Sequence, residues 1–244
     1  IKKILETKQG EKYFVKDISQ DYHMKYGAIK AADMKKAKDG DVLVSNKGQE
    51  CAIYSPSFID SYKKIKRLAQ IPLPKDIGFF IAELGLGRKS VIADAGAGSG
   101  GVACFLGNIV KKVYTFDIRD DHLAVVKENV TNLGLKNVVV EKRSVYEELP
   151  KLQVDAFFLD VPEPWNAVNT VEKALKVGGF AISYSPNLTS VSSFVNIINE
   201  NKKFAIIKTV ELIEQPWDVM DRKIKPMSER IHSGFMTIVR KIRN

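Results

Sequence analysis

The chain has 244 residues, of which 45% are hydrophobic and 27% are charged, and its formal net charge is +9. This composition is typical of one large globular domain, alone or with a small companion, and it excludes a disordered or collagen-like chain. It also excludes a membrane bundle, because no stretch approaches the ~20 apolar residues that span a bilayer. Cys51 and Cys104 lie far apart, outside any metal-binding spacing, so we expect a reduced, cytoplasmic protein.

The positive charge is concentrated in the two ends of the chain. Residues 1–70 carry 15 Lys/Arg and 9 Asp/Glu, residues 71–219 carry 16 and 18, and residues 220–244 carry 7 and 2. The balances are therefore +6, −2 and +5. Such a split favours a near-neutral catalytic middle flanked by surfaces that bind a polyanion, and it fits equally well a basic surface that serves solubility.

The first 60 residues predict a small β domain. We expect strands at residues 12–15 and 41–45, and a hairpin that returns through residues 51–54. Residues 57–70 then place apolar side chains at helical spacing, which predicts a basic helix.

From residue 76 onward, predicted helices alternate with predicted strands. The helices are expected at residues 76–86, 101–109, 121–133, 168–175 and 190–201. The strands are expected at residues 90–94, 112–117, 137–141, 154–160, 180–184, 205–212 and 234–240. This alternation predicts βαβ units and a mostly parallel sheet, with an antiparallel edge where two strands arrive near the C-terminus.

A glycine-rich loop joins the short strand at residues 90–94 to the helix that follows it. The loop reads Asp94-Ala95-Gly96-Ala97-Gly98-Ser99-Gly100-Gly101. Glycines allow a tight turn and a close approach of backbone to ligand, and the free N–H groups of the helix start favour a carboxylate or phosphate. Dinucleotide-binding enzymes use a similar turn, but here an acid ends the strand and the third glycine comes one residue earlier than in GxGxxG. The form D-x-G-x-G-x-G is typical of Rossmann-like methyltransferases that use S-adenosylmethionine, and a turn needed only for packing is the alternative.

Two further acids follow apolar strands. Asp117 comes about 20 residues after the glycine loop, where a carboxylate can accept hydrogen bonds from both ribose hydroxyls of a cofactor. Asp160 opens the loop Asp160-Val161-Pro162-Glu163-Pro164-Trp165, which its prolines stiffen and which is a variant of a motif common in amino-methyltransferases. Because ligands bind at the carboxyl ends of parallel strands, we expect both acids beside the glycine loop.

Together these motifs resemble those of the TrmI-type tRNA (adenine-N1)-methyltransferases, from about residue 40 to the end of the chain. Four more motifs carry the resemblance: Gln70-Ile71-Pro72-Leu73-Pro74-Lys75-Asp76-Ile77-Gly78, Phe116-Asp117-Ile118-Arg119-Asp120-Asp121-His122, Tyr184-Ser185-Pro186-Asn187 and His232-Ser233-Gly234-Phe235. Each motif is weak alone, but their order and spacing are specific in combination.

The resemblance implies an α/β, Rossmann-like class I methyltransferase fold with a small N-terminal β domain, usually assembled as a homotetramer. It implies as substrate the T-loop adenosine at tRNA position 58, and in archaeal members also position 57. We accordingly divide the chain into a β domain at residues 1–60 that is a candidate for RNA binding, a linker helix and cofactor-side loop at 61–75, and an S-adenosylmethionine-dependent catalytic domain at 76–244.

The resemblance also assigns roles to individual residues. The glycine loop would hold the methionine part of S-adenosylmethionine through Asp94, Gly96, Ala97, Gly98, Ser99, Gly100 and Gly101. Asp117 would bind the ribose, and His122 would flank the adenosyl pocket unless it is an exposed residue of the helix start. Asp160 would contact both the cofactor and the target adenine, and Tyr184 would line the pocket of the target base; both are predicted as catalytic. The chain departs from the family where Asp117 replaces a frequent Glu, and where Ser144 and Val145 occupy the place of a frequent acid beside the cofactor.

Other functions share part of this pattern. A methyltransferase of a small molecule or a protein would keep the same cofactor site and use the basic ends for solubility. A non-catalytic tRNA-binding paralogue is disfavoured by the intact Asp94, Asp117 and Asp160, and a nicotinamide oxidoreductase by the glycine spacing. We therefore expect a cytoplasmic enzyme, without membrane association, that methylates N1 of a T-loop adenosine in its partner tRNA.

Overall fold

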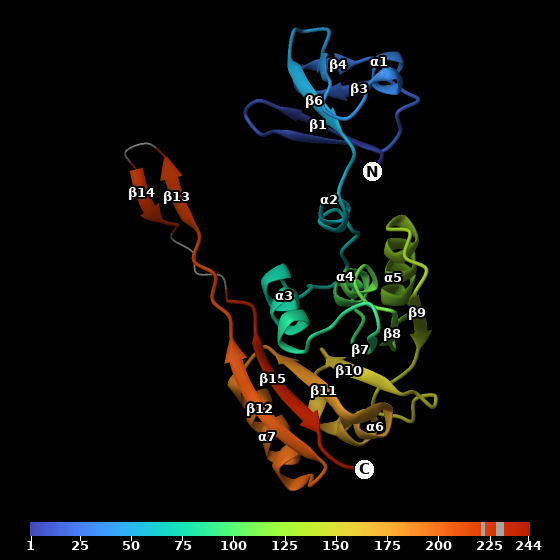
Figure 1. The fold of residues 1–244 in the computed structure, drawn as a ribbon, viewed down its shortest axis with the longest axis vertical. Coiled ribbons are helices and arrows are strands. Elements are labelled where there is room, and N and C mark those ends of the chain that lie inside the picture. The colour runs from blue at the N-terminus through green and yellow to red at the C-terminus, as the bar shows by residue number, and fades with distance from the viewer. Residues whose placement is uncertain (221–222, 228–231) are drawn as a thin grey trace. The chain divides into compact units, whose positions relative to one another are not determined.

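The structure is a computed structural model that describes residues 1–220, 223–227 and 232–244. Its internal contacts divide the chain into two compact units, Ile1–Ile65 and Lys66–Asn244, which are described one after the other (Figure 1). None of the helices in these described stretches has the length and hydrophobicity that a bilayer span requires.

The first unit contains a four-stranded antiparallel sheet. In spatial order its strands are β2 (Lys12–Val15), β1 (Lys3–Thr7), β6 (Glu50–Tyr54) and β5 (Val42–Val44). The sequence predicts three of these four strands. It misses β1 and also the short elements β3 (Tyr22–Met24), β4 (Gly27–Ile29) and α1 (Ala31–Lys36). Ile29 and Met34 from these short elements are buried with Leu5, Val15 and Ile53 of the sheet, so they complete its small core.

The basic helix expected over residues 57–70 is wrong, because only α2 (Phe58–Tyr62) is helical. Side chains of the second unit take up the backbone groups of the residues that follow. Asn129 Oδ1 accepts the N–H of Lys66 at 2.9 Å, and Ser99 Oγ accepts the N–H of Leu68 and of Ala69 at 2.9 and 2.8 Å. These backbone groups therefore do not make the bonds of a helix, and residues 66–72 form an irregular segment, bent at residues 68–69, that we call the strap.

The second unit is built on a seven-stranded sheet with helices on both faces. In spatial order its strands are β12 (Phe204–Glu211), β15 (Phe235–Lys241), β11 (Leu175–Ser185), β10 (Val154–Leu159), β7 (Val91–Ala95), β8 (Lys112–Asp117) and β9 (Val138–Lys142). The predicted parallel sheet is confirmed, since every neighbouring pair is parallel except the two that β15 makes. The predicted antiparallel edge is also present, because the two C-terminal strands, β12 and β15, form an antiparallel pair at one edge of the sheet, with β15 between β11 and β12.

The helices bury the apolar residues of the sheet from two sides. They are α3 (Pro74–Glu83), α4 (Gly101–Gly107), α5 (Asp120–Asn132), α6 (Val168–Ala174) and α7 (Leu188–Glu200), with a 3-10 turn at Pro164–Ala167. On one face, α6 and α7 pack on Phe157 and Leu159 of β10. On the other face, Phe80 of α3 contacts Phe158, with ring centroids 5.0 Å apart. All four apolar residues at the end of β10 are buried, which fixes the direction in which this strand delivers the loop after it.

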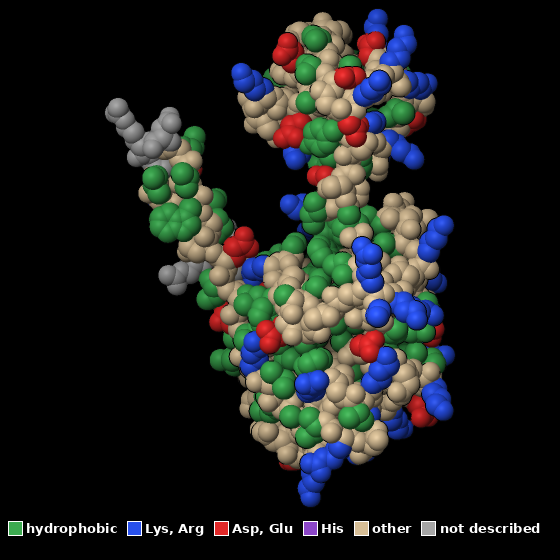
Figure 2. All heavy atoms as spheres, in the orientation of Figure 1, with side chains coloured by type: hydrophobic (Ala, Val, Ile, Leu, Met, Phe, Trp, Pro, Cys, Tyr) green, Lys and Arg blue, Asp and Glu red, His purple; other side chains and the backbone are tan. Residues whose placement is uncertain are grey.

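A hairpin that the sequence analysis misses interrupts the chain between β12 and β15. Its strands are β13 (Trp217–Met220) and β14 (Lys223–Pro226), and Figure 2 shows its apolar side chains exposed. Lys75 Nζ contacts the chain before and after this hairpin. It donates to the carbonyl oxygen of Leu212 and to Ser233 Oγ, each at 2.6 Å. Lys75 Nζ also lies 2.9 Å from Asp76, which is fully buried in the first turn of α3.

The basic residues at the end of β15 and directly after it differ in their surroundings. Lys241 is only 8% exposed, and its Nζ donates to the carbonyl oxygens of Glu172 and Leu175, at 2.8 and 2.9 Å. It therefore satisfies the C-terminal carbonyls of α6, which the helix itself leaves open. Arg243 is exposed.

We expect Lys241→Met to lower the free energy of unfolding by about 1–3 kcal/mol, because it leaves two buried carbonyl groups without a donor. Arg243→Ala removes the same charge from an exposed position, and its effect should stay within about 0.5 kcal/mol. Urea unfolding of both variants measures the difference. Equal midpoints for Lys241→Met and the parent would show that Lys241 is not a structural donor.

Candidate functional site

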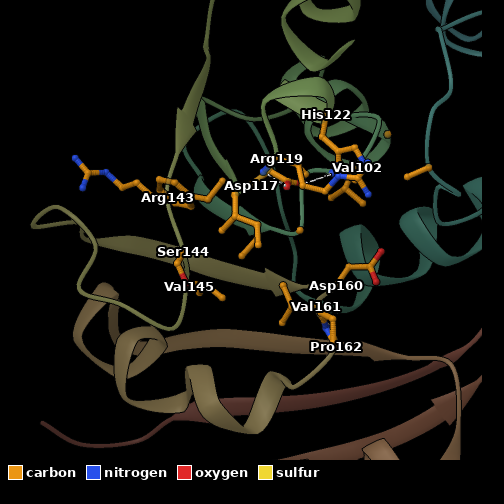
Figure 3. A pocket seen from close by; sticks show the side chains of 18 of the residues that line it. Val102, Asp117, Arg119, His122, Arg143, Ser144, Val145, Asp160, Val161 and Pro162 are labelled. Carbon is orange, nitrogen blue, oxygen red and sulfur yellow. Dashed lines mark hydrogen bonds and ion pairs between the residues drawn. The ribbon is translucent and has the colours of Figure 1, made fainter. Parts of the chain in front are cut away.

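A cavity of about 350 Å³ opens at the carboxyl ends of β7, β8 and β10 (Figure 3). Its volume is within the range of small-molecule sites. The loops after these strands line it together with Ala69–Pro72 of the strap. Most of the residues predicted for the cofactor contribute to its lining, namely Gly96, Ala97, Gly98, Gly101, Asp117, His122, Ser144, Val145 and Asp160.

The strap is held over the glycine loop by two polar side chains. Ser99 Oγ accepts two backbone N–H groups of the strap and donates to the carbonyl oxygen of Ala69 at 2.9 Å. Asn129 Nδ2 donates to the carbonyl oxygens of Lys66 and of Ser99, each at 2.9 Å. Ser99 therefore holds in place the strap residues that line the cavity, although Ser99 itself is not one of the lining residues. The role of Asn129, a buried polar residue within α5, has no signal in the sequence motifs.

Two glycines of the loop are required by close approach of other chain segments. Gly96 has φ 83°, and a Cβ atom there would lie 1.8 Å from the carbonyl oxygen of Asp160. A Cβ atom at Gly101 would lie 2.7 Å from the side chain of Ile71 in the strap. Because Asp160 also donates its N–H to the carbonyl oxygen of Ala95 at 2.9 Å, the loops after β7 and β10 are in direct contact.

The Asp117 carboxylate is fixed by backbone donors. Its Oδ2 accepts the N–H of Gly98 and its Oδ1 the N–H of Arg119, each at 3.0 Å. His122 Nδ1 lies 3.1 Å from Oδ2. Since each carboxylate oxygen accepts two hydrogen bonds, Oδ1 keeps capacity for a hydroxyl group of a ligand. Figure 3 shows Asp117 and His122 on one side of the cavity, and Asp160 with Val161 and Pro162 on another.

Asp160 and Asp94 are two carboxyl groups in different surroundings. Burial raises the pKa of Asp160 to about 6, and among the described residues none donates a hydrogen bond to its carboxylate or pairs with it. Asp94 is fully buried beneath the loop, accepts a hydrogen bond from Thr115 Oγ1 at 2.7 Å, and does not line the cavity. Burial raises the pKa of Asp94 to about 7, and the charges of Asp160 and Asp117 add to this. Asp160 is thus the carboxylate that a ligand with N–H donors or a positive charge would stabilise.

Tyr184 and Gly100 also lie outside the lining of the cavity. The hydroxyl of Tyr184 donates to Asp76 Oδ2 at 3.2 Å, and its ring centroid lies 6.0 Å from that of Phe158. Burial raises the pKa of Tyr184, so its phenol stays protonated and cannot act as a base near neutral pH. Gly100 has φ 78° and is the N-cap residue that directly precedes α4, and the side chain of Val126 packs against it.

The far end of the cavity, beyond Asp117, lacks a further acid. The carboxylates among its described lining residues are Asp117 and Asp160. Ser144 Oγ accepts the N–H of Tyr146 at 3.2 Å, and Val145 is buried. Tyr146, which the sequence analysis does not single out, lines the cavity, and its hydroxyl accepts the N–H of Glu163 at 3.2 Å. This end therefore offers a hydroxyl, apolar groups and backbone to a ligand.

The sheet order and the acid–glycine loop define a Rossmann-like, S-adenosylmethionine-dependent methyltransferase. Solved structures of this class cover the whole chain. One is an S-adenosylmethionine-dependent O-methyltransferase from Thermotoga maritima, with a TM-score of 0.89, 26% identity and 93% of its own chain covered. Another, the tRNA (m1A58) methyltransferase TrmI from Aquifex aeolicus, has a TM-score of 0.82, 22% identity and 98% of its chain covered, and shows the fold.

Residues 63–236 match the family model of the tRNA methyltransferase complex GCD14 subunit, and the chain belongs to this family. The tRNA (adenine(57)-N(1)/adenine(58)-N(1))-methyltransferase TrmI of Methanocaldococcus jannaschii is 30% identical over 98% of this chain and 94% of that protein. The tRNA (adenine(58)-N(1))-methyltransferase TrmI of Thermus thermophilus is 28% identical over 98% of this chain and 96% of its own length. The predicted family resemblance is confirmed.

We expect Gly96→Ala to weaken S-adenosylmethionine binding at least tenfold, because its methyl group would displace Asp160 from the cavity. Gly134→Ala is the matched control: φ is 67° there as well, but a Cβ atom meets nothing within 4 Å. The control should lose about 1–2 kcal/mol of stability from the left-handed backbone and keep cofactor affinity. Calorimetric titration and thermal unfolding test both. Parental affinity in Gly96→Ala would contradict the packing argument.

Proposed function

We infer that this protein transfers a methyl group from S-adenosylmethionine to N1 of an adenosine in the T-loop of tRNA, at position 58. The observation that carries this inference is the Asp160 carboxylate, which stands without a protein partner among the described residues beside the glycine loop. The full-length similarity to proteins named for this reaction supports the same substrate.

The residues of the cavity fit the cofactor. The backbone at Gly96 and Gly98 leaves no side chain between the loop and a ligand, which suits the methionine part. Asp117 Oδ1 has capacity for a ribose hydroxyl, and His122 braces Asp117 from the adenosyl side. Ser144, Val145 and Tyr146 surround the place left for the adenine ring. The unpartnered charge of Asp160 suits a cationic sulfonium nearby.

When bound, S-adenosylmethionine supplies a methyl group on a sulfonium, an electrophile that needs no further activation. The target nitrogen, N1, carries a lone pair, so the protein needs to orient the base rather than deprotonate it. We propose that Asp160 accepts a hydrogen bond from the N6 amino group and stabilises the positive charge that grows on the ring. Tyr184, with its hydroxyl bound to Asp76, would form a wall of the base pocket and exchange no proton.

The surroundings of the reaction are also proposals. A T-loop adenine must be flipped out of its stack to enter the cavity, and the N-terminal β domain at residues 1–60 is proposed to bind RNA during that step. Apolar residues of the β13–β14 hairpin are more than half exposed, which supports self-association into a homotetramer; they are Trp217, Val219, Met220 and Ile224. We place the enzyme in the cytoplasm.

Asp117→Ala should weaken S-adenosylmethionine binding at least tenfold. The variant loses charge-assisted hydrogen bonds to the ribose, each worth about 1.5–3 kcal/mol. Asp120→Ala, an exposed acid three residues further on, should bind like the parent. Calorimetric titration compares the three proteins. An affinity equal to the parent's would remove the ribose assignment.

Asp160→Asn should fold, bind tRNA, and transfer the methyl group about a hundredfold more slowly or worse, because a preorganised charge at the developing cation is lost. Single-turnover transfer at saturating tRNA and cofactor measures this step. Asp120→Asn removes an equal charge from the same edge of the sheet and should keep the parental rate. Near-parental transfer by Asp160→Asn would refute its catalytic role.

The pH profile supplies a second check on Asp160. Only the ionised carboxylate carries the charge that stabilises the developing cation, so kcat/KM should fall as the pH is lowered through the raised pKa of Asp160, about 6. Asp94 titrates near pH 7 but lies outside the cavity. The acid limb should therefore disappear in the residual activity of Asp160→Asn. A limb that persists in this variant would assign it to Asp94.

A further inference from the structure

The loops that lead into the parallel strands are basic. They lie at the amino ends of these strands, whereas the cavity lies at the carboxyl ends, and we call these two sides of the sheet its two edges. Each of the loops into β7, β8, β9, β10 and β12 carries at least one exposed Lys or Arg. Lys176 lies at the start of β11, and β15, which runs in the reverse direction, ends among these loops. We call this group the basic edge, and its exposed members are Arg88, Lys89, Lys111, Lys136, Lys151, Lys176, Lys202, Arg240 and Arg243.

Backbone contacts show that these loops lie side by side. The N–H of Lys111 donates to the carbonyl oxygen of Ser90 at 3.0 Å, directly after Lys89. The N–H of Val113 donates to Asn137, next to Lys136, at 3.0 Å. At the other end of the row, the N–H of Ile242 donates to Lys203 at 2.8 Å.

A concave surface occupies the middle of the basic edge. It is a cavity of about 480 Å³, and Lys89, Lys176 and Arg240 contribute to its lining. Arg240 is held in place there, because its Nε donates to the carbonyl oxygen of Gly178 at 3.0 Å and its guanidinium lies 4.9 Å from the ring centroid of Phe180. The carboxylate among the described lining residues, Asp155, is paired with Lys176 at 2.6 Å.

The two edges of the sheet differ in how their charges are paired. At the cavity edge three cations that follow or end β8 and β9 are bound by acids: Arg119 to Asp121 at 2.7 Å, Lys142 to Asp120 at 2.6 Å and Arg143 to Glu141 at 3.0 Å. On the basic edge, by contrast, Lys176 is the member that pairs with a carboxylate, and its other cations have no carboxylate partner among the described residues. Their full charge therefore faces solvent and attracts a polyanion.

Strands of five and six residues separate the two edges by about 17–20 Å. A nucleotide bound at Asp160 is too short to reach the basic edge. A molecule that contacts both edges at once must therefore be larger than a nucleotide. We propose that the basic edge binds the sugar–phosphate backbone of the substrate tRNA at a stretch outside the T-loop. This proposal rests on the proposed function, and the concave surface favours a phosphate ridge over a flat lipid surface.

The test compares two triple variants of equal charge change in the full chain. Arg88→Ala, Lys89→Ala and Lys136→Ala together neutralise the basic edge. Lys127→Ala, Lys142→Ala and Lys173→Ala remove three exposed cations elsewhere in the same unit and serve as the control. Binding of full-length tRNA and of an isolated T-arm stem-loop is measured from low to moderate salt.

We expect the edge variant to bind full-length tRNA about tenfold more weakly at moderate salt, with a salt slope reduced by about 2, since each phosphate contact contributes about 0.7–0.9. Its affinity for the stem-loop and for S-adenosylmethionine, and its single-turnover rate at saturating tRNA, should match the control. Such a result supports the proposal, and methyl transfer by the parent separately checks the proposed function.

Three results would overturn the proposal. Equal tRNA binding by the edge and control variants would show that these cations are only solvated. An equal loss on the stem-loop would show a general effect of net charge. Loss of binding to phosphatidylserine-containing vesicles with unchanged tRNA binding would assign the edge to a lipid surface.

Discussion

The geometry of the site depends on one close contact, between the backbone at Gly96 and the carbonyl oxygen of Asp160. A Cβ atom at position 96 would approach that oxygen to 1.8 Å, so the ends of β7 and β10 touch only because glycine stands there. The contact places the glycine loop and an unpartnered carboxylate in one cavity. Methyl transfer requires the reacting atoms to approach to about 3–3.5 Å, and adjacent binding elements make such an approach possible without a large movement of the chain.

The strap adds a second constraint on the same cavity. Its backbone is bound by Ser99, which belongs to the glycine loop, and by Asn129, which belongs to α5. Ile71 of the strap packs on Gly101 so closely that a Cβ atom there would lie 2.7 Å away. The segment that precedes the catalytic fold in the sequence thus lines the cavity, and its position depends on hydrogen bonds rather than on helix formation.

The sequence predicts the parts of this structure that a strong pattern specifies. The strand β8 (Lys112–Asp117) agrees residue for residue, and the glycine loop and Asp160 lie together because parallel strands end at one edge. Strands of three residues, such as β3, are too short to show alternation, and the exposed hairpin has no apolar face turned to a core. The buried pair Lys75–Asp76 reads as surface charge until the fold encloses it. Summing charge along residues 71–219 gives −2 and conceals a difference between the two ends of the strands: three cations at the carboxyl ends are paired with acids, whereas most of those at the amino ends are not.

The position of β15 has a consequence for how the sheet assembles. β12 pairs with β15 alone, and β15 follows it only after the hairpin, so β12 leaves the ribosome before its partner exists. Until β15 arrives, both β12 and the outer side of β11 present unpaired backbone groups to the solvent. Completion of the sheet is therefore a single late event that closes two pairings at once, and the nascent chain is most exposed to aggregation or to chaperone binding just before it.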